Sequence, residues 1–101
     1  MNRETATTAS TVAIVLDGDT NAGYQLARSL LAAGRRVAVV ARHPADVVRV
    51  MHGQSADRAM AIAADVDDPH QWSRVTERVM DRFGRIDSVV RAEDGKLRAT
   101  A

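Results

Sequence analysis

The sequence contains no cysteine and has very few aromatic residues. The lack of cysteine excludes disulfides, thiolate catalysis and cysteine-ligated zinc or iron–sulfur sites. One Trp, one Tyr and one Phe are too few to stack nucleic-acid bases, and the 14 basic residues are interspersed with 13 acidic ones. The sequence therefore predicts no nucleic-acid partner.

Long apolar runs are also missing. No segment approaches the roughly 18 apolar residues that cross a bilayer. The first ten residues, MNRETATTAS, lack the apolar stretch of a secretory signal. We therefore expect no contact with a membrane and a cytoplasmic location. The 101 residues, 46% of them hydrophobic and 27% charged, have the composition of a single globular domain.

The periodic part of the chain lies between two polar ends. Residues 1–10 and 94–101 show no periodicity, so we expect flexible tails flanking a domain at 11–93. Short apolar runs, the first two rich in β-branched residues, are typical of strands buried on both faces of a parallel sheet. Four such runs are found: Thr11–Leu16, Arg36–Ala41, Ala59–Ala64 and Ile86–Val90.

Helical spacing fills the intervals between these runs. Apolar residues recur three or four positions apart in 22–33, 45–51 and 69–83, and Asp68-Pro69 is typical of a helix start. Strands that alternate with helices predict right-handed crossovers in a parallel sheet. We therefore expect an α/β, Rossmann-like half-domain of about four strands in the order 3-2-1-4, with about three helices.

Two stretches carry a family resemblance. Residues 16–34, LDGDTNAGYQLARSLLAAG, form a strand–turn–helix with glycines in the turn. Residues 63–87, AADVDDPHQWSRVTERVMDRFGRID, combine an Asp-Val pair, a capped amphipathic helix and a Phe-Gly-Arg-Ile-Asp ending. Together they resemble the first half of a short-chain dehydrogenase/reductase, and the resemblance covers nearly all of residues 11–90.

The resemblance implies a turn that admits the pyrophosphate of a dinucleotide at the start of a helix. Gly18 opens this turn, Asn21 stands where the family has its middle glycine, and Gly23 serves as the last glycine. Asn tolerates positive φ better than most residues. Asp17 and Asp19 flank Gly18. They either repel a phosphate or are solvated turn residues with no anion bound.

The resemblance also implies a nucleotide preference. Family members that use NADP often place an Arg after the second strand, and Arg42 stands there, with Arg35 in the preceding turn. Asp65, paired with Val66, would contact the adenine amino group. The alternative for Arg42 is an exposed strand-end charge, and the alternative for Asp65 is a strand-end or helix-entry cap. Weak NADP binding and no cofactor at all are the two alternatives.

Catalytic residues are not found. The family uses a Tyr with a Lys four residues later, whereas Tyr24 is followed by Arg28, and the single Lys is Lys96. Segment 91–95, RAEDG, replaces the family's Asn-Asn-Ala-Gly motif. A calcium loop starting at Asp17 would need Gly where Ala22 stands and Glu where Arg28 stands, so no metal site is predicted. We expect a catalytically inactive binding or regulatory module rather than an enzyme.

A half-domain of this kind would leave surfaces uncovered. An unpaired fourth-strand edge and an under-covered sheet face around Val89 and Val90 favour association. We therefore expect a homodimer or a protein partner. Two alternatives remain, namely an interaction module with no cofactor and a reductase completed by another chain.

Overall fold

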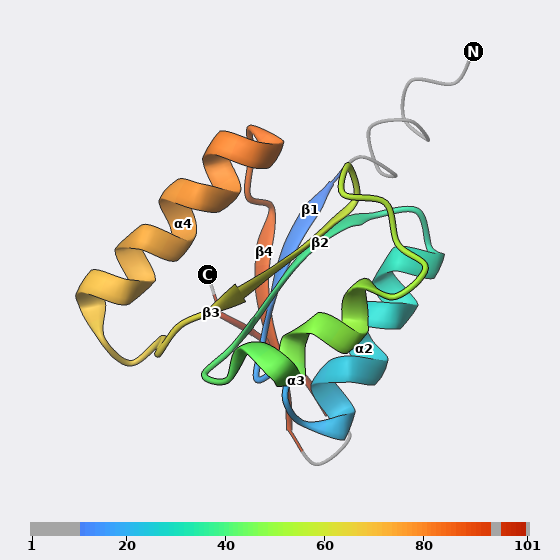
Figure 1. Cartoon of the computed structure of the whole chain (residues 1–101), viewed down its shortest axis with the longest axis horizontal. Coiled ribbons are helices and arrows are strands. Elements are labelled where there is room, and N and C mark those ends of the chain that lie inside the picture. The colour runs from blue at the N-terminus through green and yellow to red at the C-terminus, as the bar shows by residue number, and fades with distance from the viewer. Residues whose placement is uncertain (1–10, 94–95, 101) are drawn as a thin grey trace.

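The computed structural model describes residues 11–93 and 96–100. Its elements alternate along the chain as predicted (Figure 1). They are β1 (Val12–Leu16), α2 (Asn21–Ala32), β2 (Arg36–Ala41), α3 (Pro44–Val48), a 3₁₀ turn (Arg49–Met51), β3 (Ala59–Ala63), α4 (Pro69–Phe83), β4 (Ser88–Glu93) and β5 (Lys96–Thr100). The four expected strands and three expected helices are confirmed. The predicted amino-terminal tail lies outside the described residues.

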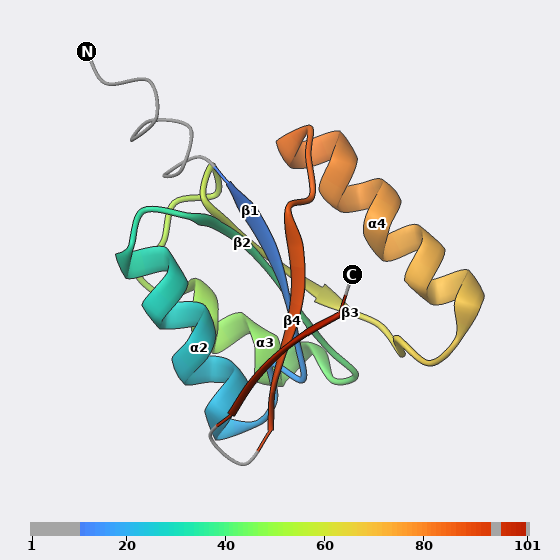
Figure 2. The ribbon, with the colours of Figure 1, turned by 180° about the vertical axis from the view of Figure 1, so that it is seen from behind.

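The strands form one sheet in the order β3-β2-β1-β4-β5. Four of them are parallel, which confirms the predicted 3-2-1-4 order. β5 is an addition that runs antiparallel to β4 (Figure 2). Glu93 lies opposite Lys96 in this pair. The predicted flexible tail at 94–101 is therefore wrong for Lys96–Thr100. This segment has no apolar pattern of its own, and it becomes a strand because the β4 edge supplies hydrogen-bond partners.

The pairing of β5 changes the expected association surface. β4 is not an edge strand, so the prediction of an open fourth-strand edge is wrong. Val90 is buried and Val89 is half-buried against the core, so the expected apolar exposure at these two residues is also wrong. Association with a partner stays a prediction, and the outer strand of the described sheet is β5.

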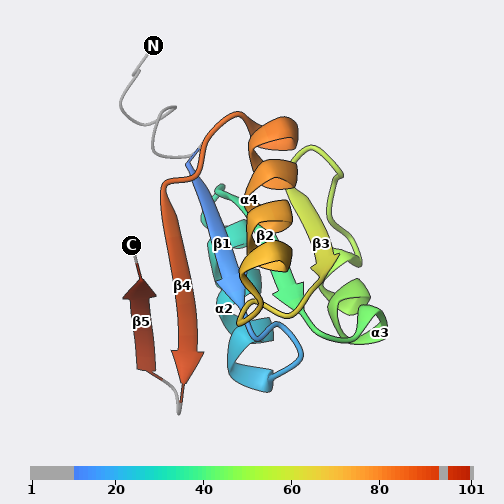
Figure 3. The ribbon, with the colours of Figure 1, turned by 90° about the vertical axis from the view of Figure 1, so that its left-hand side faces the viewer.

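The sheet is covered on both faces. α2 and α3 lie on one face and α4 lies on the other (Figure 3). All five residues of β1 are buried, since its side chains alternate between the two layers. Ile14 packs in the layer of α4, and Val15 packs in the layer of α2 and α3. This two-sided burial explains why β1 and β2 are continuous apolar runs.

Helix α4 shows the predicted start and stop. The carboxylate of Asp68 accepts a hydrogen bond from the backbone N–H of His70 at 2.9 Å, and Pro69 occupies the first helical position. Gly84 ends the helix with φ +79°, a left-handed conformation that favours glycine. Val75, Val79 and Phe83 are the buried stripe. No helix in the described ranges has the length and apolar character needed to cross a membrane.

The amino-terminal edge of the parallel strands is held by hydrogen bonds that charged side chains donate or accept. Asp87 accepts from the Val12 N–H at 2.8 Å, and its own N–H donates to the Val12 carbonyl at 2.9 Å. Arg85 donates to both oxygens of the same carboxylate, at 2.8 and 2.6 Å. These bonds hold the pKa of Asp87 below its usual value, chiefly through Arg85. Arg36 donates to the Phe83 carbonyl at 3.1 Å.

Candidate functional site

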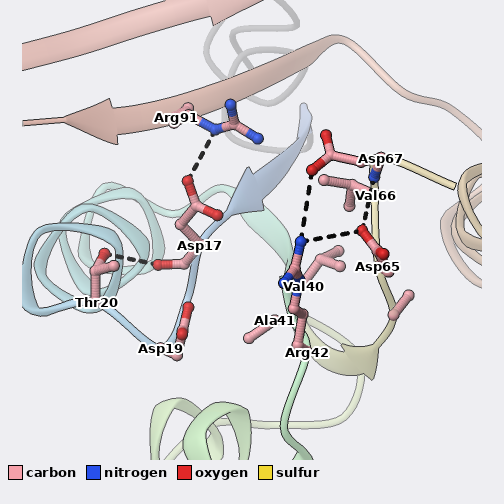
Figure 4. Close-up of a pocket in the computed structure, with 11 residues that line it drawn as sticks. Asp17, Asp19, Thr20, Val40, Ala41, Arg42, Asp65, Val66, Asp67 and Arg91 are labelled. Carbon is pink, nitrogen blue, oxygen red and sulfur yellow. Dashed lines mark hydrogen bonds and ion pairs between the residues drawn. The ribbon is translucent and has the colours of Figure 1, made fainter.

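A cavity of about 240 Å³ lies at the opposite edge, where the parallel strands end (Figure 4). In sheets of this type ligands bind beyond the carboxyl ends of the strands, where neighbouring connections leave in opposite directions. β1 has this place in the fold, because β2 and β4 flank it. The lining consists of Asp17, Asp19, Thr20, Val40, Ala41, Arg42, Ala64, Asp65, Val66, Asp67 and Arg91.

The turn between β1 and α2 is held by its own backbone and by one side chain. Asp17 has φ +55°, the only positive φ outside glycine in the described chain. Its carbonyl accepts from the Thr20 N–H at 3.0 Å and from the Thr20 hydroxyl at 2.7 Å. The same Thr20 oxygen accepts from the Gly23 N–H at 3.0 Å and caps α2. The turn is thus fixed without a ligand.

The two turn glycines are required for packing. A Cβ on Gly18 would lie 2.2 Å from Cγ1 of Val39, and one on Gly23 would lie 2.2 Å from the Asp17 carbonyl oxygen. Both glycines are buried, and neither lines the cavity. Asn21 is exposed as the first residue of α2. The positive φ considered for Asn21 is found at Asp17 instead, because Asn21 already belongs to the helix.

Three predicted ligand residues do meet in the cavity: Arg42, Asp65 and Val66. The Arg42 guanidinium lies 3.5 Å from Asp65 and 3.6 Å from Asp67, and its side chain is 65% exposed. Asp65 also accepts from the Asp67 N–H at 3.0 Å. It is therefore a turn residue after β3, while the cap of α4 is Asp68. Long contacts in water hold Arg42 weakly.

Arg91 contributes the second cation of the cavity. β4 pairs with β1 so that Arg91 lies opposite Leu16, the residue before Asp17. Its Nε lies 2.8 Å from Oδ2 of Asp17 (Figure 4). The lining thus contains four aspartates and two arginines and is acidic overall. Among the described residues, no three His, Cys, Asp or Glu side chains are arranged so that they could hold a metal ion.

Two residues considered from the sequence lie elsewhere. Arg35 precedes β2, whereas Arg42 follows it, so the strand separates them by about 20 Å. Arg35 therefore does not assist Arg42. Tyr24 packs beside the α2 core, accepts a 3.3 Å hydrogen bond from Arg28, and lies under the Arg49 guanidinium, 4.3 Å from its ring centre. Tyr24 therefore packs and bonds locally within its own layer.

The sequence analysis did not identify three features of the site, namely Thr20, Asp67 and the pairing of Arg91 with Asp17. Thr20 had a readable signal, because Thr directly before a helix is a common cap. Asp67 had none, since a second acid after β3 becomes relevant only when Arg42 folds against it. Arg91 was visible only as a departure from the family motif. Its contact with Asp17 joins residues 74 positions apart and depends on strand register.

Solved structures resemble this fold. A short chain dehydrogenase from Bacillus anthracis superposes with a TM-score of 0.76 at 21% identity, over 81% of this chain and 35% of that one. The 3-ketoacyl-(acyl-carrier-protein) reductase of Brucella melitensis, complexed with NADH, gives 0.73 at 26% identity, over 78% and 32%. Actinorhodin polyketide ketoreductase (F189W) with NADPH gives 0.74 at 26% identity, over 83% and 33%.

These comparisons correct one expectation. The prediction that the chain is not an enzyme is wrong, because its structural relatives are dehydrogenases and reductases. The chain spans about a third of their length. A Tyr–Lys pair missing from so short a span therefore says nothing about catalysis in the protein.

Family membership rests on the sequence itself. No relative is found among curated protein sequences. The family model for short chain dehydrogenases matches residues 11–92, far more than half of the chain. This match includes the turn after β1, the end of β2 and the Asp-Val pair after β3. The chain therefore belongs to the short-chain dehydrogenase family.

Proposed function

We propose that this chain forms the dinucleotide-binding part of a short-chain oxidoreductase and binds NADP(H) weakly in the cavity at the strand ends. The observation that carries the proposal is the position of Arg42, which follows β2 and lines that cavity with Asp65 and Val66. A guanidinium at this place is suited to a ribose 2′-phosphate. Two of the relatives described above were solved with cofactor, one with NADH and one with NADPH, so the family's fold accepts both.

The residues suit the adenine and the ribose 2′-phosphate of such a ligand better than they suit its pyrophosphate. The half-buried Val66 offers an apolar wall to an adenine, and the exposed Arg42 is free to turn toward a phosphate. The phosphate turn presents carboxylates instead, from Asp17 and Asp19. A carboxylate 4 Å from a phosphate costs roughly 1 kcal/mol in water and about 4 kcal/mol at an effective dielectric of 20. This repulsion is the reason for proposing weak binding.

When bound, the nicotinamide supplies hydride chemistry, and this chain's own residues hold the other end of the molecule. Arg42 pairs with the 2′-phosphate, and Asp65 accepts from the adenine amino group. Gly18 and Gly23 keep the turn close to the sheet, because a Cβ at either place would force it outward. The contribution of these residues to the reaction is therefore binding and orientation.

Calorimetric titration of the 101-residue chain with NADPH and NADH tests the proposal. Arg42→Ala should weaken NADPH binding about tenfold, since a hydrogen bond to a charged group contributes about 1.5 kcal/mol. It should leave NADH binding unchanged. Arg74→Ala is the matched control, because this arginine is exposed on α4 outside the cavity. No heat with either nucleotide at millimolar concentration would refute cofactor binding.

Self-association through β5 is a second proposal. β5 is the outer strand of the described sheet and pairs with β4 on one side. The other side of such a strand offers backbone groups to a second copy of the chain. Light scattering over a concentration series should show a dimer. A strict monomer at all concentrations would refute it.

A further inference from the structure

The contact between Asp17 and Arg91 is close but incomplete. The two groups lie 2.8 Å apart, yet the Nε of Arg91 is buried and makes no hydrogen bond with the described residues. A contact at this distance without hydrogen-bond direction gains charge attraction and little more. The Arg91 side chain is 30% exposed, against 65% for Arg42. Arg91 is thus a partly desolvated cation with an unused Nε donor.

Asp17 is held in place by its backbone and not by Arg91. Its carbonyl accepts hydrogen bonds from Thr20, its backbone is left-handed, and its carboxylate points toward Arg91 (Figure 4). The carboxylate itself is 41% exposed. Loss of Arg91 as a partner would therefore leave it hydrated and the turn intact. Another anion can therefore replace the Asp17 carboxylate at Arg91 without disturbing the turn.

We infer that Arg91 binds the phosphate of the dinucleotide, and that the Asp17 carboxylate is the exchangeable counter-ion of Arg91 when no phosphate is bound. The inference rests on the proposed function and adds a residue to it. Arg91 lies beside the β1 turn, and a phosphate entering there can accept two parallel hydrogen bonds from a guanidinium. The phosphate then replaces Asp17 at Arg91. The ion pair is a competitor of the ligand, and it closes the site to weaker anions.

Competition predicts opposite effects for the two partners. Arg91→Gln should weaken NADPH binding about tenfold or more, because a charged hydrogen-bond donor is lost. Asp17→Asn should strengthen it about fivefold by removing the competing charge, and Asn tolerates the left-handed backbone. A purely structural ion pair predicts the same direction for both variants, since each would loosen the same turn.

Calorimetry on the 101-residue chain with NADPH and with inorganic pyrophosphate measures these effects. Asp19→Asn is the matched control, because it removes the same charge from the same cavity at a residue outside the ion pair. The gain from Asp17→Asn should fall by at least half in the Arg91→Gln background. The gain from Asp19→Asn should be equal in both backgrounds. Pyrophosphate binding should be lost in Arg91→Gln, which assigns the contact to phosphate.

The outcomes distinguish failure of the inference about Arg91 from failure of the proposed cofactor binding. Binding of NADPH by the wild type with equal affinity in Arg91→Gln overturns the inference alone. Weaker binding in Asp17→Asn, or an equal gain with and without Arg91, also overturns it. No binding by any variant overturns the proposed function and the inference together. Arg91→Lys keeps the charge and should lose less affinity than Arg91→Gln, and circular dichroism should show an unchanged fold for each variant.

Discussion

The two ends of the parallel strands use charged residues in different ways. At the amino-terminal edge, Asp87 and Arg36 bond backbone groups of neighbouring elements at 2.8 and 3.1 Å. At the carboxyl-terminal edge, Arg42 has only ion pairs of 3.5 and 3.6 Å, and Arg91 has a 2.8 Å pair without hydrogen-bond direction. A charged side chain that hydrogen-bonds to a backbone group is held in place, because its loss would leave that group without a partner. A charged side chain that is only ion-paired with another side chain can change partners. The first edge holds the sheet, and the second is available to a ligand.

Substitution of Gly23 should have the largest effect, because it disturbs backbone packing at the carboxyl-terminal edge while it leaves every charge in place. In Gly23→Ala the new Cβ would meet the Asp17 carbonyl oxygen at 2.2 Å, so α2 must shift. We expect a loss of about 3 kcal/mol in the free energy of unfolding, at the upper end for overpacking. Urea denaturation measures it. Ala22→Gly on the same helix should cost no more than about 1 kcal/mol. Equal costs would show that the turn is loose.

Removal of the Asp87 carboxylate should have the next largest effect. Asp87→Ala leaves the N–H of the buried Val12 without its acceptor, which costs about 2 kcal/mol. Urea denaturation again measures the loss. Asp81→Ala, on the exposed side of α4, should change stability by less than about 0.5 kcal/mol. Equal losses would remove the distinction between the two edges.

The pH dependence gives Asp87 a second readout. Its pKa is lowered in the fold, chiefly by the hydrogen bonds from Arg85. The unfolded chain therefore binds the proton more readily, so the contribution of Asp87 is complete above its usual value of 3.8 and is lost as pH falls toward the lowered pKa. Asp87→Asn should flatten the stability profile in that acid range. A profile identical to the wild type would contradict this role.

Arg42 should have the smallest effect on stability. Its side chain is exposed, and its two ion pairs are long, so Arg42→Ala should change the free energy of unfolding by less than about 0.5 kcal/mol. The same variant should lose NADPH affinity. Thermal unfolding with and without NADPH measures both. A loss above about 1 kcal/mol without ligand would show that Arg42 helps to hold the fold, and would contradict the difference between the two edges.

Much of the fold was predictable because its signals are local. Continuous apolar runs indicated β1 and β2, and Asp68, Pro69 and Gly84 marked the ends of α4. The family resemblance located the turn after β1 and Arg42 after β2. β5 escaped prediction because its formation depends on the edge of β4 and not on its own side-chain pattern.

The sequence alone determined the element order, the parallel topology and the family, since periodicity and capping are written in neighbouring residues. Which charges meet depends on how distant segments pack together. Strand register placed Arg91 beside Asp17, and the turn after β3 placed Asp65 and Asp67 around Arg42. Gly18 and Gly23 likewise became packing residues only when β2 and the Asp17 carbonyl closed on them. Such contacts join distant segments, and their energies depend on a few ångströms that no local pattern encodes.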